Sequence, residues 1–265
     1  ACLACVLIIA ACATSPTGRS QLQLFSEQQL SEMGKMSHEK MAQEIPVEES
    51  PEVNKYVSCV VQAVTSTLPG SLGQRSWKVT VFDQADSVNA FALPGGYIGI
   101  YTGLLQVADT PDQLAAVVGH EIAHVTAEHP NARLSAQFAT KTGLQVVDAF
   151  LQGRSVGAGN QIMALLGVGS QVGVLLPFSR AQEEEADILG LDYMARAGFD
   201  PSQSIDLWQN MAEAGGKSPP EFLSTHPSEH SRIENLKSHM DRAMELYSRA
   251  RRQGRTPQCS EPEIN

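Results

Sequence analysis

The chain has 265 residues, of which 42% are hydrophobic and 18% are charged, and this composition is typical of a globular protein with a sizeable core. It excludes an intrinsically disordered chain, which would carry fewer apolar residues and more charge. The formal net charge is −10 and the sequence has no stripe of Lys and Arg. A nucleic-acid partner is therefore not expected, because phosphate binding needs clustered positive charge.

The first residues, Ala1 to Cys12, form an apolar run that is too short to cross a bilayer. We interpret this run as the end of a secretory signal peptide, in which Ile9-Ala-Ala-Cys12 resembles the cleavage box of bacterial lipoproteins. Cys12 would become the lipidated N-terminus, and the polar stretch from Ala13 to Ser20 would tether it. Ala13 rather than Asp follows the cysteine, which by resemblance favours the outer membrane. The alternative is an ordinary signal peptide with an incidental Cys12.

Helical and strand-like patterns alternate in the next part of the chain. Helices are predicted from Ser26, a candidate cap, to about Glu44 and from about Pro51 to Leu68. Three short strands follow, and the turn Pro94-Gly-Gly96 joins the last two as a hairpin. The strands are predicted at residues 77–83, 88–93 and 97–101. We expect them to form a small antiparallel sheet.

The second half of the chain is predicted to be mainly helical. After a short helix at Gly103, the predicted helices cover residues 113–128, 132–150, 179–197, 201–214 and 227–252. Residues 153–173 carry six glycines and are either a mobile flap beside a cleft, which we favour, or a tightly packed helix pair. The predicted fold is α+β, mainly α. One domain covers residues 21–254, between an N-terminal segment of residues 1–20 and a polar tail of residues 255–265.

The segment His120-Glu121-Ile-Ala-His124 carries the strongest chemical signal. Residues four apart lie on one face of a helix, so both imidazoles can reach a single ion. Glu121 sits about 100° around the helix axis, where its carboxylate can address a water on that ion. This is the zinc-binding arrangement of a metalloprotease. The alternative is an exposed polar helix, but apolar residues bracket the motif and indicate a buried one: Leu114, Val117, Val118, Ile122 and Val125.

A catalytic zinc site needs a third protein ligand and an open position. The predicted helix 179–197 supplies Glu183, and Asp187 lies four residues later on the same face. Glu183 would complete the ligand set, while Asp187 would accept the N–H of a ligand imidazole. Glu184 and Glu185 lie on other faces and are predicted to be solvated.

The other candidate ligands are given ordinary roles. Glu128 and His129 are predicted to lie on the surface. A third-ligand role for Glu128 is not expected, because it would distort the helix face. His38 is predicted to be a surface or hydrogen-bonded histidine. His230 and His239 are predicted to be exposed on the last helix.

The two motifs together resemble the zinc metallopeptidase family of HtpX and the CAAX prenyl endopeptidases, and its soluble periplasmic lipoprotein branch, the BepA and LoiP type, fits best. The order His120-Glu121-x-x-His124 and then Glu183-x-x-Ala186-Asp187 carries the resemblance. Further matches are Asn89-Ala-Phe-Ala-Leu-Pro-Gly-Gly96, Ser179-Arg180, Thr225-His226-Pro227 and Arg232. The resemblance implies a helical zincin-type metalloprotease domain that holds one Zn²⁺ per chain.

Within that family, the strand that contains Asn89, Ala90, Phe91 and Ala92 would bind substrate by adding it as an extra strand. Zinc would activate a water, and Glu121 would act as its general base. His226 and Arg232 are the candidates for stabilising the oxyanion. By resemblance, His226 is alternatively a ligand that fills the open zinc position in a latent state, and a packing role for it is also open.

The implied activity is endopeptidase cleavage of unfolded or misassembled periplasmic and outer-membrane proteins. The implied partners are those substrates, the membrane through a lipid anchor, and the outer-membrane assembly machinery. The alternative is an envelope chaperone or assembly factor whose zinc is structural. Intact Glu121 beside the ligand pair favours catalysis, because a structural site does not need it.

Two cysteines remain after those of the N-terminal segment, namely Cys59 and Cys259. Such an even pair in an oxidising compartment is compatible with a disulfide. The alternative is a buried Cys59 and a free Cys259 on a frayed tail.

Overall fold

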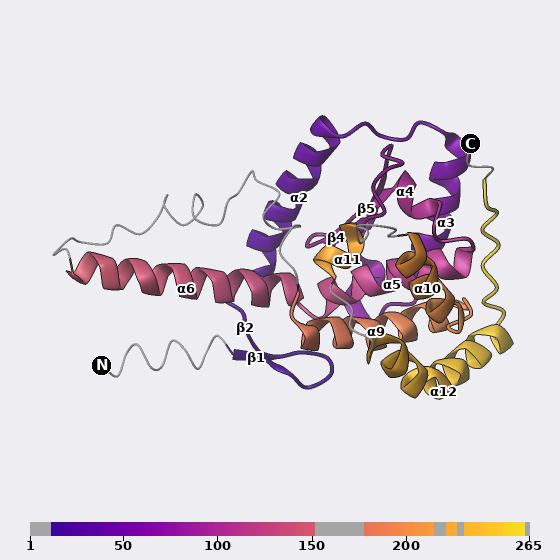
Figure 1. Cartoon of the computed structure of the whole chain (residues 1–265). Coiled ribbons are helices and arrows are strands. Elements are labelled where there is room, and N and C mark those ends of the chain that lie inside the picture. The colour runs from indigo at the N-terminus through magenta and orange to yellow at the C-terminus, as the bar shows by residue number, and fades with distance from the viewer. Residues whose placement is uncertain (1–11, 152–177, 215–220, 227–230, 263–265) are drawn as a thin grey trace.

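The computed structural model describes residues 12–151, 178–214, 221–226 and 231–262 (Figure 1). The lipoprotein cleavage box before Cys12, the glycine-rich residues 153–173 and His230 lie outside these ranges, so their predictions stay predictions. Among the described helices, none is both long enough and apolar enough to span a bilayer.

The helix that carries the His-Glu-x-x-His motif, α5 (Pro111–Thr126), lies at the centre of the fold, and every residue from Gln113 to Val125 is buried. Its most extensive contact is with α9 (Arg180–Ala197), and α12 (Ser231–Arg252) packs on α9 in turn. Two further helices pack on α5, namely α3 (Pro51–Thr65) and α10 (Gln203–Ala214). The core is therefore a helical bundle around α5, as the apolar pattern predicted.

Side-chain caps fix where the long helices begin. Ser26 and Ser179 each form a capping box, at the starts of α2 (Glu27–Glu44) and α9, and Thr110 caps α5. The cap at Ser26 agrees with its prediction, and α9 begins one residue after its predicted start. The short helices are α4 (Thr102–Leu105), α11 (Glu221–Thr225) and the 3₁₀ turn η1 (Gly70–Gln74). Neither α11 nor η1 was predicted.

The junction after α5 differs from its prediction. Glu128 has a φ of 58°, in the left-handed region, which ends α5 sharply. The next helix, α6 (His129–Leu151), starts at once and extends away from the body of the molecule (Figure 1). The helix predicted from residue 132 therefore begins at His129, and Pro130 lies in its first turn, a position where its missing N–H costs nothing.

The main sheet contains β3 (Lys78–Phe82), β4 (Ala90–Leu93) and β5 (Tyr97–Tyr101) in the order β3-β5-β4. The β4–β5 hairpin is antiparallel, as predicted. The prediction of an all-antiparallel sheet is wrong at β3, which pairs in parallel with β5. The reason is that β5 occupies the middle, so β3 joins its other side and the chain then crosses to β4. One edge of β4 is left beside α5.

A second, two-stranded sheet was not expected from the sequence. β1 (Cys12–Thr14) and β2 (Ser20–Leu22) pair in an antiparallel hairpin where a polar tether was predicted. We call residues 12–22 the N-terminal hairpin. It is fastened to the end of α5, because the Gln21 side-chain amide donates a hydrogen bond to the carbonyl oxygen of Ala127 at 2.9 Å.

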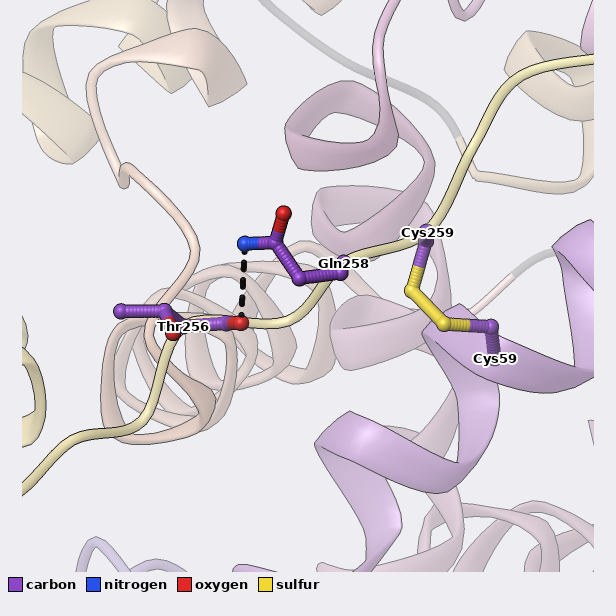
Figure 2. The surroundings of a disulfide bond; sticks show 4 residues. All are labelled: Cys59, Thr256, Gln258 and Cys259. Carbon is purple, nitrogen blue, oxygen red and sulfur yellow. Dashed lines mark hydrogen bonds between the residues drawn. A yellow bond between two sulfur atoms is a disulfide. The ribbon is translucent and has the colours of Figure 1, made fainter.

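Cys59 of α3 and Cys259 of the C-terminal tail are joined by a disulfide bond (Figure 2). The two cysteines are separated by 200 residues, so the bond closes a very long loop. The loop-entropy model gives such a bond a stabilisation of about 5 kcal/mol. Of the two possibilities left open by the sequence, the structure contains the bridge.

Candidate metal centre

Four buried side chains from three parts of the chain converge at the centre of the bundle. His120 and His124 come from α5, Glu183 comes from α9, and His226 directly follows α11. One donor atom of each lies within 4.8 Å of all the others. The sequence predicted the first three as ligands, and the structure brings them together.

The spacing of these donor atoms fits zinc. Tetrahedral bonds of 2.0–2.1 Å require donor atoms about 3.3 Å apart. The Nε2 atoms of His120 and His124 are 3.1 Å apart, and they lie 3.4 and 3.5 Å from the two carboxylate oxygens of Glu183. His226 Nδ1 is 3.2 Å from His120 Nε2 and 3.1 Å from Glu183 Oε1. A set of imidazole nitrogens and one carboxylate is also the donor chemistry that zinc prefers.

Asp187 and Arg232 hold the His120 and Glu183 side of the cluster. His120 Nδ1 lies 2.9 Å from Asp187 Oδ1, the contact predicted from the four-residue spacing of the two acids. The buried Arg232 donates from Nε to Asp187 at 2.7 Å and from Nη2 to Glu183 at 2.5 Å. Its guanidinium also lies 4.0 Å from the ring centre of Trp208. Arg232 therefore contacts the two carboxylates with Nε and Nη2, while its buried Nη1 has no hydrogen-bond partner among the described residues. Its role in stabilising an oxyanion stays a prediction.

The charges of the cluster couple the protonation of its members. Burial opposes a charge on His120, but hydrogen bonds to Asp187 and Glu183 outweigh it and raise the pKa of His120 to about 9. Burial likewise opposes ionisation of Glu183, yet its partners His120 and His226 hold the pKa of Glu183 well below the usual range. A metal ion would have to displace the His120 proton, so its affinity should weaken in acid.

Glu121 lies beside the ligands with one oxygen engaged and one not. Its Oε2 accepts a hydrogen bond from the Ala92 backbone N–H at 3.3 Å, while its buried Oε1 has no hydrogen-bond partner among the described residues. His226 Nε2 is 3.4 Å from that Oε1. Burial raises the pKa of Glu121, which suits a group that must accept and return a proton near neutral pH.

His129 and Glu185 correct two predictions. His129 was predicted on the surface, but it is 0% exposed, and its Nδ1 lies 2.9 Å from His124 Nδ1. Glu185 was predicted to be solvated, but it is 3% exposed and lies 3.1 Å from His129 Nε2. The sharp turn at Glu128 folds His129 back under α5, and the N-terminal hairpin covers Glu185. Glu184 is exposed, as predicted.

The predicted substrate strand only partly reaches the site. Ala92 meets Glu121, but Asn89 accepts a hydrogen bond from the neighbouring Ala90 N–H, and Phe91 packs on Phe82 and Tyr101. The strand lies at the edge of the sheet, but α11 already uses part of that edge. The Phe222 N–H donates to the carbonyl oxygen of Val88 at 3.1 Å.

Comparison with protein families decides what kind of site this is. The model of peptidase family M48 matches residues 51–240, which contain all four donor side chains, Glu121, Asp187 and Arg232. The chain belongs to peptidase family M48. Its members are metallopeptidases, and the donor cluster could hold the metal ion of such an enzyme.

Curated relatives are similar over much of this chain. The mitochondrial metalloendopeptidase OMA1 of Saccharomyces cerevisiae is 36% identical over 182 residues, and the bovine OMA1 is 32% identical over 251 residues. The beta-barrel assembly-enhancing protease of Yersinia pestis is 33% identical over 158 residues. These matches cover 66%, 87% and 58% of this chain but only 50%, 46% and 32% of the relatives. The chain thus spans about half of the relatives' length or less.

Proposed function

We propose that the chain is a zinc-dependent endopeptidase of the bacterial cell envelope that cleaves unfolded or misassembled periplasmic and outer-membrane proteins. The observation that carries the proposal is the convergence of His120, His124 and Glu183 beside the buried carboxylate of Glu121, whose Oε1 forms no hydrogen bond with the described residues. The envelope is supported by the lipoprotein-like residues before Cys12, by a disulfide that suits an oxidising compartment, and by the likeness to a protease named for β-barrel assembly. The likeness to mitochondrial enzymes makes a mitochondrial location the competing one.

The chemistry divides between the ion and the protein. When bound, zinc would lower the pKa of a water to about 7 and polarise the scissile carbonyl group. Glu121 would take the proton of that water at Oε1 and pass it to the leaving amine nitrogen. Asp187 would keep the His120 proton on Nδ1, and Arg232 would balance the negative charge of Glu183 and Asp187.

His226 supports a latent form of the enzyme. Its Nδ1 lies 3.2 Å from His120 Nε2 and 3.1 Å from Glu183 Oε1, so with His226 all four tetrahedral positions would be taken. A catalytic site needs one position for water, so we propose that His226 is the fourth ligand in a closed state and moves away on activation. Its ring stacks on Phe222 at 4.5 Å, which ties it to α11.

Opening would also free the substrate strand. While the Phe222 N–H is bonded to Val88, part of the β4 edge is not available to a peptide. Movement of α11 together with His226 would release that edge, and an extended substrate could then pair with Ala90 to Ala92 across from Glu121.

The same four-ligand set also fits a second candidate function, because structural zinc sites typically have four protein ligands and no open position. In that case the protein would be an envelope chaperone or assembly factor. Glu121→Gln separates the two functions. For the peptidase we expect zinc content to be unchanged and hydrolysis of unfolded casein to fall by about 10²–10⁴-fold.

The matched control is Glu184→Gln, an exposed acid that should leave hydrolysis unchanged. Zinc and proteolysis should be measured on the same samples with and without chelator. Casein cleavage by Glu121→Gln at the wild-type rate would refute the peptidase. Absence of wild-type cleavage, combined with unfolding of His120→Ala, would favour the structural zinc site.

A further inference from the structure

A buried chain of polar contacts leads outward from the second metal-site histidine. His124 Nδ1 lies 2.9 Å from His129 Nδ1, and His129 Nε2 lies 3.1 Å from Glu185 Oε2. The exposed fractions of the three residues are 1%, 0% and 3%, so water does not compete for these contacts. None of the roles assigned so far to the ligands or to Glu121 explains why His129 and Glu185 are buried here.

The N-terminal hairpin covers the outer end of this series of polar contacts, at Glu185. Thr17 reaches Glu185 Oε1 with its hydroxyl at 2.7 Å and its backbone N–H at 3.2 Å. Arg19 donates from Nε to Glu185 Oε2 at 3.1 Å. These donors are 166 and 168 residues away from Glu185 in sequence, so they meet it only through the fold. Glu185 is therefore held from both sides.

The proton positions along the chain follow from the direction of His124. Its Nε2 faces the other donor atoms, so a bound metal would leave its single proton on Nδ1, which points to His129 Nδ1. His129 Nδ1 must then accept, and its own proton must lie on Nε2. That N–H then donates to Glu185 Oε2, and a carboxylate is an acceptor when it is ionised.

His120 is supported in the same way as His124, but by a shorter series of contacts. His120 contacts the carboxylate of Asp187 directly, whereas His124 reaches the carboxylate of Glu185 through one intervening imidazole. Carboxylates behind ligand histidines fix the tautomer and the ring orientation, and removing one costs about 10–100-fold in metal affinity.

We propose that His129 and Glu185 are positioning residues for the ligand His124, and that the N-terminal hairpin is part of the metal centre through Thr17 and Arg19. This inference deepens the proposed function and rests on its zinc site. It gives the N-terminal hairpin a chemical role, because Thr17 and Arg19, a few residues after Cys12, help to set the affinity for the metal ion.

The test is zinc affinity of the full metal-free chain, measured by competition with a chromogenic chelator. His129→Phe keeps an aromatic side chain but removes both hydrogen bonds, and we expect a 10–100-fold loss of zinc affinity. His129→Gln can accept a hydrogen bond from His124 and donate one to Glu185, so it should keep most of the wild-type zinc affinity. Thr17→Val should cost about three- to tenfold, because the Thr17 backbone N–H still reaches Glu185.

The matched control is Thr14→Val, the same change at an exposed position of the same hairpin, which should leave affinity unchanged. In the His129→Phe background, Thr17→Val should cause no further loss of zinc affinity if both residues act through the same series of contacts. The Co²⁺-loaded variants add a spectroscopic readout: the visible ligand-field bands should shift in His129→Phe and return in His129→Gln. A purely structural role would not produce this pattern.

The outcomes separate the two proposals. A folded His129→Phe with wild-type zinc affinity would overturn the positioning role. If His129→Phe does not fold, equal affinities of Thr17→Val and Thr14→Val would overturn it. Tight wild-type zinc binding without casein cleavage would refute the peptidase, while the affinity pattern would still support the positioning chain.

Discussion

Gly119 of α5 and Gly190 of α9 touch each other through their backbones. A Cβ atom on Gly119 would lie 2.7 Å from the Gly190 carbonyl oxygen, and one on Gly190 would lie 2.7 Å from the His120 backbone nitrogen. The contact is one residue from a metal-site histidine, and α9 carries Glu183. The distance between the two helices therefore sets the distance between donor atoms that lie far apart in sequence.

Gly119→Ala should push the two helices apart, because the added methyl group meets backbone rather than a flexible side chain. We expect the variant to lose about 1–3 kcal/mol of unfolding free energy and to bind zinc more weakly. Urea unfolding and chelator competition measure the two effects. Glu184→Ala, at an exposed position of α9, is the control. Unchanged stability and affinity in Gly119→Ala would show that the helices can separate freely.

His226→Ala should activate the enzyme if His226 is the fourth ligand of a closed state. Three donors remain, so zinc should stay bound, and casein hydrolysis should rise by about tenfold or more if the open form is a minor population. Initial rates at saturating zinc measure this. A loss of about 10²-fold would instead assign His226 to oxyanion stabilisation.

Arg232→Met should lower the stability of the metal-free protein more than that of the zinc-loaded protein. In the metal-free protein it leaves the buried carboxylates of Glu183 and Asp187 with the His120 imidazolium but without the guanidinium, and removing one partner of a buried ion pair costs about 3–5 kcal/mol. Saturating zinc should recover part of this loss, because the ion brings positive charge to the same place. Arg232→Lys keeps the charge but not the two-pronged geometry and should fall in between. Chelator-treated and zinc-loaded samples should be unfolded in parallel; equal losses in both would contradict this account.

The candidate metal site could be predicted from the sequence because it depends on local spacing. The four-residue separations of His120 and His124, and of Glu183 and Asp187, place each pair on one helix face whatever the rest of the fold does. The caps at Ser26, Thr110 and Ser179 are local for the same reason.

The residues that were missed depend on contacts between distant segments. His129 is buried only because Glu128 adopts a left-handed turn, and Glu185 is buried only because a hairpin more than 160 residues earlier covers it. Likewise, the parallel pairing of β3 with β5 depends on which strand takes the middle of the sheet, and alternation of residues does not report this. A histidine at a helix start directly before Pro130 was the one local signal available for His129.

His38 should make the fold sensitive to mild acid. The side chain is 1% exposed between α2 and the sheet, where its Nε2 lies 2.9 Å from the Thr80 hydroxyl. Burial first, and then Lys78, lowers the pKa of His38 below its ordinary value of 6.5. The unfolded chain therefore takes up a proton first, so this stability is present above about pH 6.5 and declines as the pH falls below it.

We expect His38→Gln to lose this dependence while keeping a hydrogen bond to Thr80. Urea unfolding at pH 7.5 and pH 5.5 measures it as a smaller difference between the two conditions than in the wild type. His239→Gln, a partly buried histidine of α12, is the control. An identical pH dependence in wild type and His38→Gln would exclude His38 as its source.

The bridge between Cys59 and Cys259 also encloses all the metal-site donors within one covalent ring. A peptidase is exposed to nicking by its own copies, and a single nick anywhere inside this ring yields two pieces that remain bonded to each other. Such a molecule would migrate as one species on a non-reducing gel and as two fragments after reduction. The ring thereby allows the centre to outlast a cut that would dismantle an open chain.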